Sequence, residues 1–178
     1  VAATASWLAK FENASGQVGW RVASDLNWRR LKHWRRLLGQ ALDPEAAPGA
    51  IDSVTEVLVE HGPNAVVQAW ELVSWLALRL NWQVQAGKVQ PGLEIAWQAV
   101  APHGNLRVVI RRLAEGPPEI KRMRFVCTVN GKPGALNLFA EDKQRVAIVP
   151  KGVDAAPRTV TIQALPESEL IARQLSDR

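Results

Sequence analysis

The side chains that most often carry catalysis or hold metals are few and scattered in this sequence. His33, His61 and His103 do not stand at metal-ligand spacing from one another, and Cys127 is the single cysteine. Motifs of the CxxC, HExxH, G-x-S-x-G, GxGxxG and P-loop types do not occur. We therefore expect no metal, no cofactor and no catalytic residue, and we interpret Cys127 as a small buried apolar residue and His33 as a surface residue.

Basic residues are the stronger chemical signal, because they cluster. The net charge is +5 and the pI is near 9.9. One cluster contains Arg29, Arg30, Lys32, Arg35 and Arg36, and another contains Arg107, Arg111, Arg112, Lys121, Arg122 and Arg124. Such clusters attract acidic proteins, nucleic acids or phosphorylated metabolites, or they form a solvated face with scattered counter-charges. Charge alone leaves these alternatives open.

Tryptophan is the unusual aromatic residue of this chain. There are eight tryptophans, three phenylalanines and no tyrosine, and every tryptophan lies in the first hundred residues. Trp34, Trp70 and Trp97 fall on expected apolar faces, which favours core positions. Trp28, Trp75 and Trp82 fall on the edges or polar faces of expected helices. Tryptophan beside arginine at a surface is typical of protein-interface anchors, so these three are candidates for an interface, a ligand site or partial burial.

The helix that carries the first basic cluster is predicted from the run DLNWRRLKHWRRLLGQ, residues 25–40. Ser24 or Asp25 suits its N-cap. At 100° per residue one arc is apolar and contains Leu26, Leu31, Trp34, Leu37, Leu38, Ala41 and Leu42. The opposite side carries Arg29, Lys32 and Arg36. Arg30 falls inside the apolar arc, so its guanidinium must reach outward or pair with a buried acid.

Downstream, the residue pattern changes from helical to alternating. Residues 51–62 are predicted to form a strand, and residues 63–82 a largely apolar helix packed on more than one side. Further strands are expected at 93–100, 106–113, 120–129, 135–141, 145–150 and 158–165, and a final helix begins at Pro166. Consecutive strands with short turns favour an antiparallel meander. The predicted fold class is α+β, with a mostly antiparallel sheet of about six or seven strands and helices packed on one face.

The length of the chain suits one ordinary domain with a hydrophobic core. We expect residues 1–23 to be an N-terminal lead-in segment and residues 24–178 to form a single α+β domain. The chain lacks an initiator methionine, so we expect it to be a piece of a longer one, and it shows neither a signal peptide nor an apolar run long enough to span a membrane. A single cysteine suits a reducing compartment, so the expected location is the cytoplasm.

Three stretches resemble a known family. Residues 24–43, SDLNWRRLKHWRRLLGQALD, resemble a signature of the glucose-6-phosphate dehydrogenase assembly protein family, OpcA, whose members carry a similar D-L-x-W-x-R-L-x-x-W-R stretch. The matching residues are Asp25, Leu26, Trp28, Arg30, Leu31, Trp34 and Arg35. Residues 69–82 are similar to a family helix ending in W-L-x-x-R-L-x-W, and residues 164–175 are similar to the family's closing helix. Within residues 69–82 the matching residues are Trp75, Leu76, Arg79, Leu80 and Trp82.

The resemblance implies a non-catalytic partner of glucose-6-phosphate dehydrogenase, associated with assembly or allosteric activation of that enzyme in the oxidative pentose phosphate pathway. It also implies a C-terminal domain, since the members, which occur in cyanobacteria and actinobacteria, are longer than this chain. In photosynthetic members the activation is linked to thiol redox state. Cys127 alone cannot form an intramolecular disulfide within this piece.

Residue roles are assigned from the helix pattern and the matched motifs together. The expected contact surface comprises Trp28, Arg29, Lys32, Arg36, Trp75 and Trp82. The motif positions expected to hold the fold are Asp25, Leu26, Arg30, Leu31, Trp34, Arg35 and Arg79. A motif of buried tryptophan and paired arginine is equally suited to stabilising the domain itself. We therefore do not assign the motif as the docking face.

A second hypothesis is a nucleic-acid or sugar-phosphate binding module. Arg107, Arg111, Arg122 and Arg124 are expected to form a basic platform on one face of the sheet. Their strands lack the aromatic interleaving of an RNA-binding sheet, because Phe125 is expected on the other face. We therefore rank nucleic acid below a protein partner, and an enzyme third.

Overall fold

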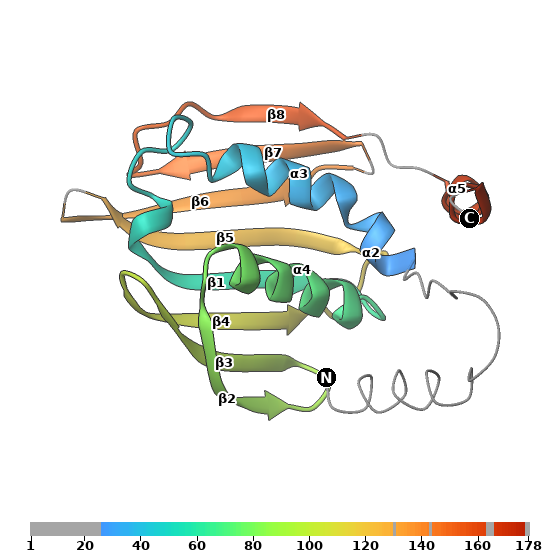
Figure 1. Ribbon diagram of the computed structural model, residues 1–178, viewed down its shortest axis with the longest axis horizontal. Helices are drawn as coiled ribbons and strands as arrows, with labels where there is room; N and C mark the ends of the chain where they lie inside the picture. Colours follow the sequence, from blue (N-terminus) through green and yellow to red (C-terminus); the bar gives the residue numbers. More distant parts are fainter. Residues whose placement is uncertain (1–25, 130, 143, 163–165, 177–178) are drawn as a thin grey trace, which may run out of the picture.

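The computed structural model describes residues 26–129, 131–142, 144–162 and 166–176, so Asp25 and the expected lead-in segment lie outside the described residues. Its centre is an eight-stranded sheet with the strand order β2-β3-β4-β1-β5-β6-β7-β8 (Figure 1). The strands are β1 Val54–His61, β2 Gln83–Gln90, β3 Glu94–Ala101, β4 Gly104–Arg112, β5 Ile120–Val129, β6 Lys132–Ala140, β7 Arg145–Lys151 and β8 Arg158–Thr161. The β1–β4 pair is parallel, and the other neighbouring pairs are antiparallel.

The predicted α+β class is confirmed, and the sheet has more strands than the six or seven expected. The unexpected strand is β2, whose sequence QVQAGKVQ is exposed at every position. An edge strand with solvent on both faces has no need of alternating apolar residues, so its sequence carries no period-two pattern.

The helices are gathered on one face of the sheet (Figure 1). They are α2 Leu26–Arg30, α3 Lys32–Ala41, the short 3₁₀ turn Ile51–Ser53, α4 Val66–Arg79 and α5 Glu167–Ser176. In Figure 1, α3 lies over β6 and β7, α4 lies over the middle of the sheet, and α5 stands at one end, beside α2. Among the described helices, none combines the length and the apolar character needed to cross a membrane.

The amphipathic helix predicted from residues 25–40 is divided into α2 and α3 at Leu31. The division is slight, because Leu31 keeps a right-handed helical backbone and its carbonyl accepts a hydrogen bond of 2.9 Å from the Arg35 N–H. The apolar arc is confirmed by burial of Leu31, Trp34, Leu37, Leu38 and Ala41. This arc packs α3 into the core and leaves the basic side outside.

Helix α4 ends earlier than residue 82, where the sequence pattern placed its end. Asn81 adopts a left-handed backbone with φ 54°, which stops the helix, and the Trp82 N–H donates to the Ala77 carbonyl at 2.8 Å. The turn directs Trp82 into the core, where 7% of it is exposed.

The connection between β4 and β5 crosses the end of β1, because β1 lies between those two strands. The Gly62 N–H donates to the Glu119 carbonyl at 3.0 Å, and a Cβ at Gly62 would overlap the Pro117 carbonyl oxygen. Glycine is therefore required at the crossing point. The crossing places Pro117 and Pro118 against α4, where the Gln68 amide lies 3.5 Å from the Pro118 carbonyl oxygen.

Candidate protein-docking site

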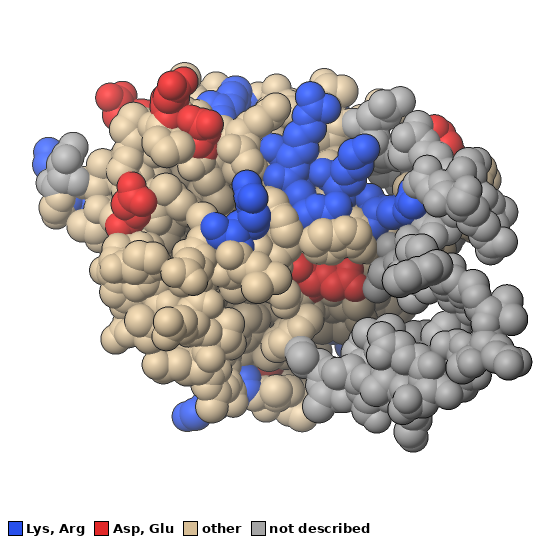
Figure 2. Space-filling model, in the orientation of Figure 1, with Lys and Arg blue, Asp and Glu red and all other residues tan. Residues whose placement is uncertain are grey.

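The first basic cluster forms a cationic patch on the helix side of the molecule. Figure 2 shows Lys and Arg side chains gathered over α2 and α3. Lys32 and Arg36 are exposed, and neither has an ion-pair or hydrogen-bond partner among the residues that the structure describes. Arg29 and Arg30 are half-buried and engaged in contacts, and Arg30 Nη1 lies 3.5 Å from Asn27 Oδ1. The outermost cations of the patch are therefore Lys32 and Arg36.

Trp28 and Arg35 form the edge of this patch. The Arg35 guanidinium carbon lies 3.7 Å from the centre of the Trp28 ring, and Arg35 Nη1 donates to the Trp28 carbonyl at 2.6 Å. Burial lowers the pKa of the Arg35 guanidinium, and the nearby Glu71 carboxylate opposes that shift. Arg35 thus fastens α3 to α2 and holds the Trp28 indole, which is 41% exposed, at the surface.

His33 lies next to the patch but does not add charge to it. Its place on the helix rim predicted a surface residue, but His33 is half-buried. Burial lowers the pKa of His33 to about 4, against the opposing effect of a hydrogen bond to the Arg30 backbone, and the charge of Arg35 lowers it further. The imidazole is therefore neutral at pH 7.

An open groove of about 1040 Å³ runs beside α2 and α3. One wall carries Arg29, Arg30, Lys32, Arg35 and Arg36, with Trp28 at the rim. The other wall comes from Pro117, Pro118 and Glu119, and the lining also includes Ile162, which follows β8, and Leu170 of α5. None of these residues was predicted at the site, because they come from parts of the chain far from α2 and α3 in the sequence.

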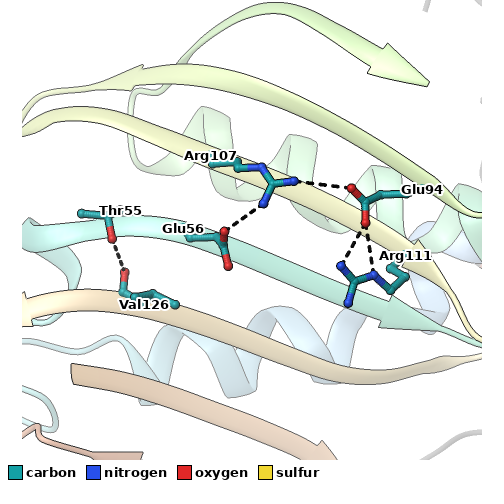
Figure 3. Close-up of polar contacts among 6 residues, drawn as sticks. All are labelled: Thr55, Glu56, Glu94, Arg107, Arg111 and Val126. Carbon is teal, nitrogen blue, oxygen red and sulfur yellow. Dashed lines mark hydrogen bonds and ion pairs between the residues drawn. The ribbon is translucent and has the colours of Figure 1, made fainter. Parts of the chain in front are cut away.

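The second basic cluster contributes three arginines to the opposite face of the sheet that pair with acids, namely Arg107, Arg111 and Arg122. Arg107 contacts Glu56 at 3.2 Å and Glu94 at 3.5 Å, and Arg111 contacts Glu94 at 3.0 Å and Glu60 at 3.8 Å. Figure 3 shows Glu94 between the two arginines. These contacts form a ladder of alternating charge across β3, β4 and β1.

Two further arginines, both from β5, lie on that face of the sheet. Arg122 contacts Glu60 at 3.1 Å, and its guanidinium carbon lies 4.7 Å from the centre of the Phe139 ring. Arg124 is exposed and has no ion pair within the described ranges. Phe125 is fully buried on the helix side, as its alternation predicted. The arginines share one face, but three of the four are paired with acids, which weakens the electrostatic attraction of this face for nucleic acid.

The remaining predicted contact residues are not all at the surface. Trp75 is half-buried and packs against the core, and Trp82 is buried within it, so the indole of Trp82 is not offered to a partner. Arg79 is exposed near the end of α4, and Leu26 is half-buried. The structure therefore brings together Trp28, Arg29, Lys32 and Arg36, and it separates Trp82 from them. In the described ranges, no group of three or more His, Cys, Asp or Glu side chains is placed to hold a metal.

Comparison with known proteins gives relatives for this chain. Three curated cyanobacterial relatives have names that include the words OxPP cycle protein OpcA. That of Synechocystis sp. is 31% identical over 70 residues, which is 39% of this chain and 15% of the relative. That of Nostoc punctiforme is 37% identical over 60 residues, which is 34% of this chain and 13% of the relative. The matched stretches are thus a small part of the relatives' own length.

One solved structure also resembles part of the fold. It is a dehydrogenase (MviM) from Clostridium difficile, with a TM-score of 0.43 and 9% identity over 85% of this chain and 51% of that chain. A likeness of this size supports no conclusion about function.

A family model matches nearly the whole chain. It describes the C-terminal domain of a glucose-6-phosphate dehydrogenase subunit, under the family name OpcA, and the match covers residues 21–178. The match includes every helix and strand that the structure describes. The chain therefore belongs to the OpcA family, as the C-terminal domain that this family model describes.

Proposed function

We propose that this protein is a non-catalytic partner of glucose-6-phosphate dehydrogenase that docks on the enzyme and favours its active assembly. The family description and the relatives' names support a role beside that dehydrogenase in the oxidative pentose phosphate pathway. The cytoplasm is the location that suits such a role. Residues 24–178 act in this proposal as the C-terminal domain of a longer protein, since the curated relatives extend well beyond the matched stretch.

The observation that carries the proposal is the pairing of exposed cations with an exposed indole on α2 and α3. Lys32 and Arg36 are solvent-accessible beside Trp28, which Arg35 holds in place. Tryptophan and arginine are among the residue types most enriched at the energetically dominant positions of protein interfaces. Because Arg35 already orders the Trp28 ring, docking there costs little side-chain entropy.

A non-catalytic role is supported by what the reactive side chains do in the fold. His61 is buried at the end of β1, with Nδ1 2.7 Å from the Gly62 carbonyl oxygen. His103 Nε2 lies 2.8 Å from the Val54 carbonyl oxygen. Cys127 is 1% exposed, and burial raises the pKa of its thiol, which disfavours the nucleophilic thiolate. Each of these groups serves packing or backbone hydrogen bonding.

Docking shifts the dehydrogenase between its active and inactive forms only if this protein binds the two forms with different affinities. If the protein binds the active assembly more tightly than the inactive form, mass action shifts the enzyme toward the active assembly. A tenfold preference corresponds to about 1.4 kcal/mol of coupling free energy. No chemical step by this chain is needed.

A titration tests the proposal. Purified glucose-6-phosphate dehydrogenase, from the organism that encodes this chain, is held at fixed substrate while this protein is added, and Km, kcat and oligomer size are measured. We expect co-elution on a sizing column and a change in at least one kinetic parameter across the shared peak. The proposal is wrong if the two proteins elute separately and neither the kinetics nor the oligomer size changes.

A further inference from the structure

We propose that the groove beside α2 and α3 binds an extended, acidic segment of the partner protein, with carboxylates at the rim and apolar side chains toward the floor. The inference deepens the proposed function and rests on it for the identity of the partner. It concerns the chemistry of the docking segment, which neither the family description nor the relatives' names address.

The charge of the groove favours a carboxylate-bearing occupant. Five cationic residues line it against two acidic ones, Glu119 and Asp142. Asp142 is already held by Arg145, with Oδ2 2.8 Å from Nε, so it does not neutralise the opposite wall. Lys32 and Arg36 pair with no acid within the described part of the chain. A segment with carboxylates supplies counter-charges to Lys32 and Arg36.

The floor of the groove is apolar. Its accessible part includes the half-buried residues Ala140 and Val160, whereas Leu31, Ile120, Ile162 and Leu170 also line the groove but are only 1%, 1%, 8% and 6% exposed. The exposed prolines of the facing wall have no N–H to donate, so that wall offers apolar contact rather than hydrogen-bond donors. Carboxylates alone would leave Ala140, Val160 and the two prolines hydrated, whereas apolar side chains between the carboxylates would cover them.

The dimensions suit a peptide better than a metabolite. The groove volume of about 1040 Å³ lies at the upper end of the roughly 300–1,000 Å³ typical of small-molecule pockets. Its helical wall runs from Trp28 to Gln40, a rise of roughly 18 Å at 1.5 Å per residue. An extended segment rises about 3.3 Å per residue, so about five or six residues span that wall. In such a segment successive side chains point to opposite sides, which matches a cationic rim over an apolar floor.

A labelled peptide tests the inference directly. The probe is a short synthetic peptide of alternating Glu and Leu, and its comparison peptide replaces each Glu by Gln. Binding to the full chain is measured by fluorescence anisotropy at about 50 to 300 mM salt, because exposed charge pairs weaken as the Debye length shortens. We expect the Glu peptide to bind at least about tenfold more tightly than the Gln peptide, and salt to reduce that ratio.

Variants and displacement complete the test. The double variant Lys32→Glu with Arg36→Glu should lose most of the preference for the Glu peptide. The matched control, Lys88→Glu with Lys151→Glu, makes the same charge change on the exposed residues of β2 and β7 and should keep it. The dehydrogenase should displace the Glu peptide from the unmodified chain.

Three results would overturn the inference: equal binding of the two peptides, an unchanged preference in the groove variant, or dehydrogenase binding that leaves the peptide in place. In the last case the docking function stands and only the groove assignment falls. Failure of the dehydrogenase to bind at all contradicts the proposed function instead, and with it the partner named here.

Discussion

The two basic clusters of this protein have similar composition and very different surroundings. On the sheet, strand register places an acid beside each of three arginines: Glu56 is opposite Arg107, and Glu60 is opposite both Arg111 and Arg122. On α3, the positions three and four residues from Lys32 are Trp28, Arg29, Arg35 and Arg36, and none of them is acidic.

The difference shows that a run of basic residues in a sequence is not yet a basic surface. Sheet neighbours come from distant parts of the chain, so acids of β1 neutralise arginines of β4 and β5. Neighbours three and four residues away on a helix come from the same run, and here they supply no acid to Lys32 or Arg36. The helix patch keeps Lys32 and Arg36 available side by side, whereas on the sheet Arg107, Arg111 and Arg122 are paired with acids and Arg124 stands alone among them. The docking proposal is therefore placed on the helix patch.

The largest effect on stability is expected at Leu38, whose side chain packs α3 into the core below the cationic patch. Leu38 is fully buried in the apolar arc of α3. The Leu38→Ala variant should lower the free energy of unfolding by about 2–5 kcal/mol, through lost burial and the cavity left behind. Urea denaturation measures this loss. Exposed Gln40 provides the control, because Gln40→Ala should change stability by less than about 0.5 kcal/mol. Similar small changes in both variants would show that this arc does not hold the patch.

A smaller effect is expected from His33, whose pKa in the folded protein is about 4 against an ordinary value of 6.5. Below pH 6.5 the unfolded chain binds a proton that the folded chain does not, so stability falls as the pH drops from 6.5 toward 4. The contribution lost near pH 4 is roughly 1–3 kcal/mol. Urea denaturation of the parent and of His33→Gln at pH 7 and near pH 4.5 isolates it, because the variant lacks this titration. A constant difference between the two proteins at both pH values would contradict the assignment.

The smallest effect is expected from the charge ladder on the sheet. Glu60 contacts two arginines, whereas Glu56 contacts one. Glu60→Gln should therefore cost about 1 kcal/mol of unfolding free energy and Glu56→Gln about half of that, with both losses reduced by salt. Chemical denaturation at low and high ionic strength measures the pair. Losses that are equal, or that do not respond to salt, would show that the ladder does not act as a network.

Much of the helix side could be predicted from the sequence, because helical neighbours are local. The apolar arc of Leu31, Trp34, Leu37 and Leu38 follows from the 3.6-residue period and is buried as expected. The α+β class likewise follows from the order of helical and alternating segments.

The features that escaped prediction depend on contacts between distant residues or on a single backbone angle. The meander pattern gave no sign that β1 pairs in parallel with β4, so the acids of β1 could not be matched to the arginines. Trp82 was expected on a polar helix face, but the left-handed Asn81 turns it inward. The Pro117–Pro118 wall of the groove depends on the crossing at Gly62, a contact between residues far apart in the sequence.

The central claim is that the α2–α3 cations, and not exposed cations of the sheet, contact the dehydrogenase. The most direct measurement compares dehydrogenase binding by the variants Lys32→Glu with Arg36→Glu and Lys88→Glu with Lys151→Glu in one calorimetric titration series. The account predicts that the first variant binds at least about tenfold more weakly than the parent, while the second stays within about twofold. Equal weakening in both variants, or an unchanged affinity in the first, would contradict it.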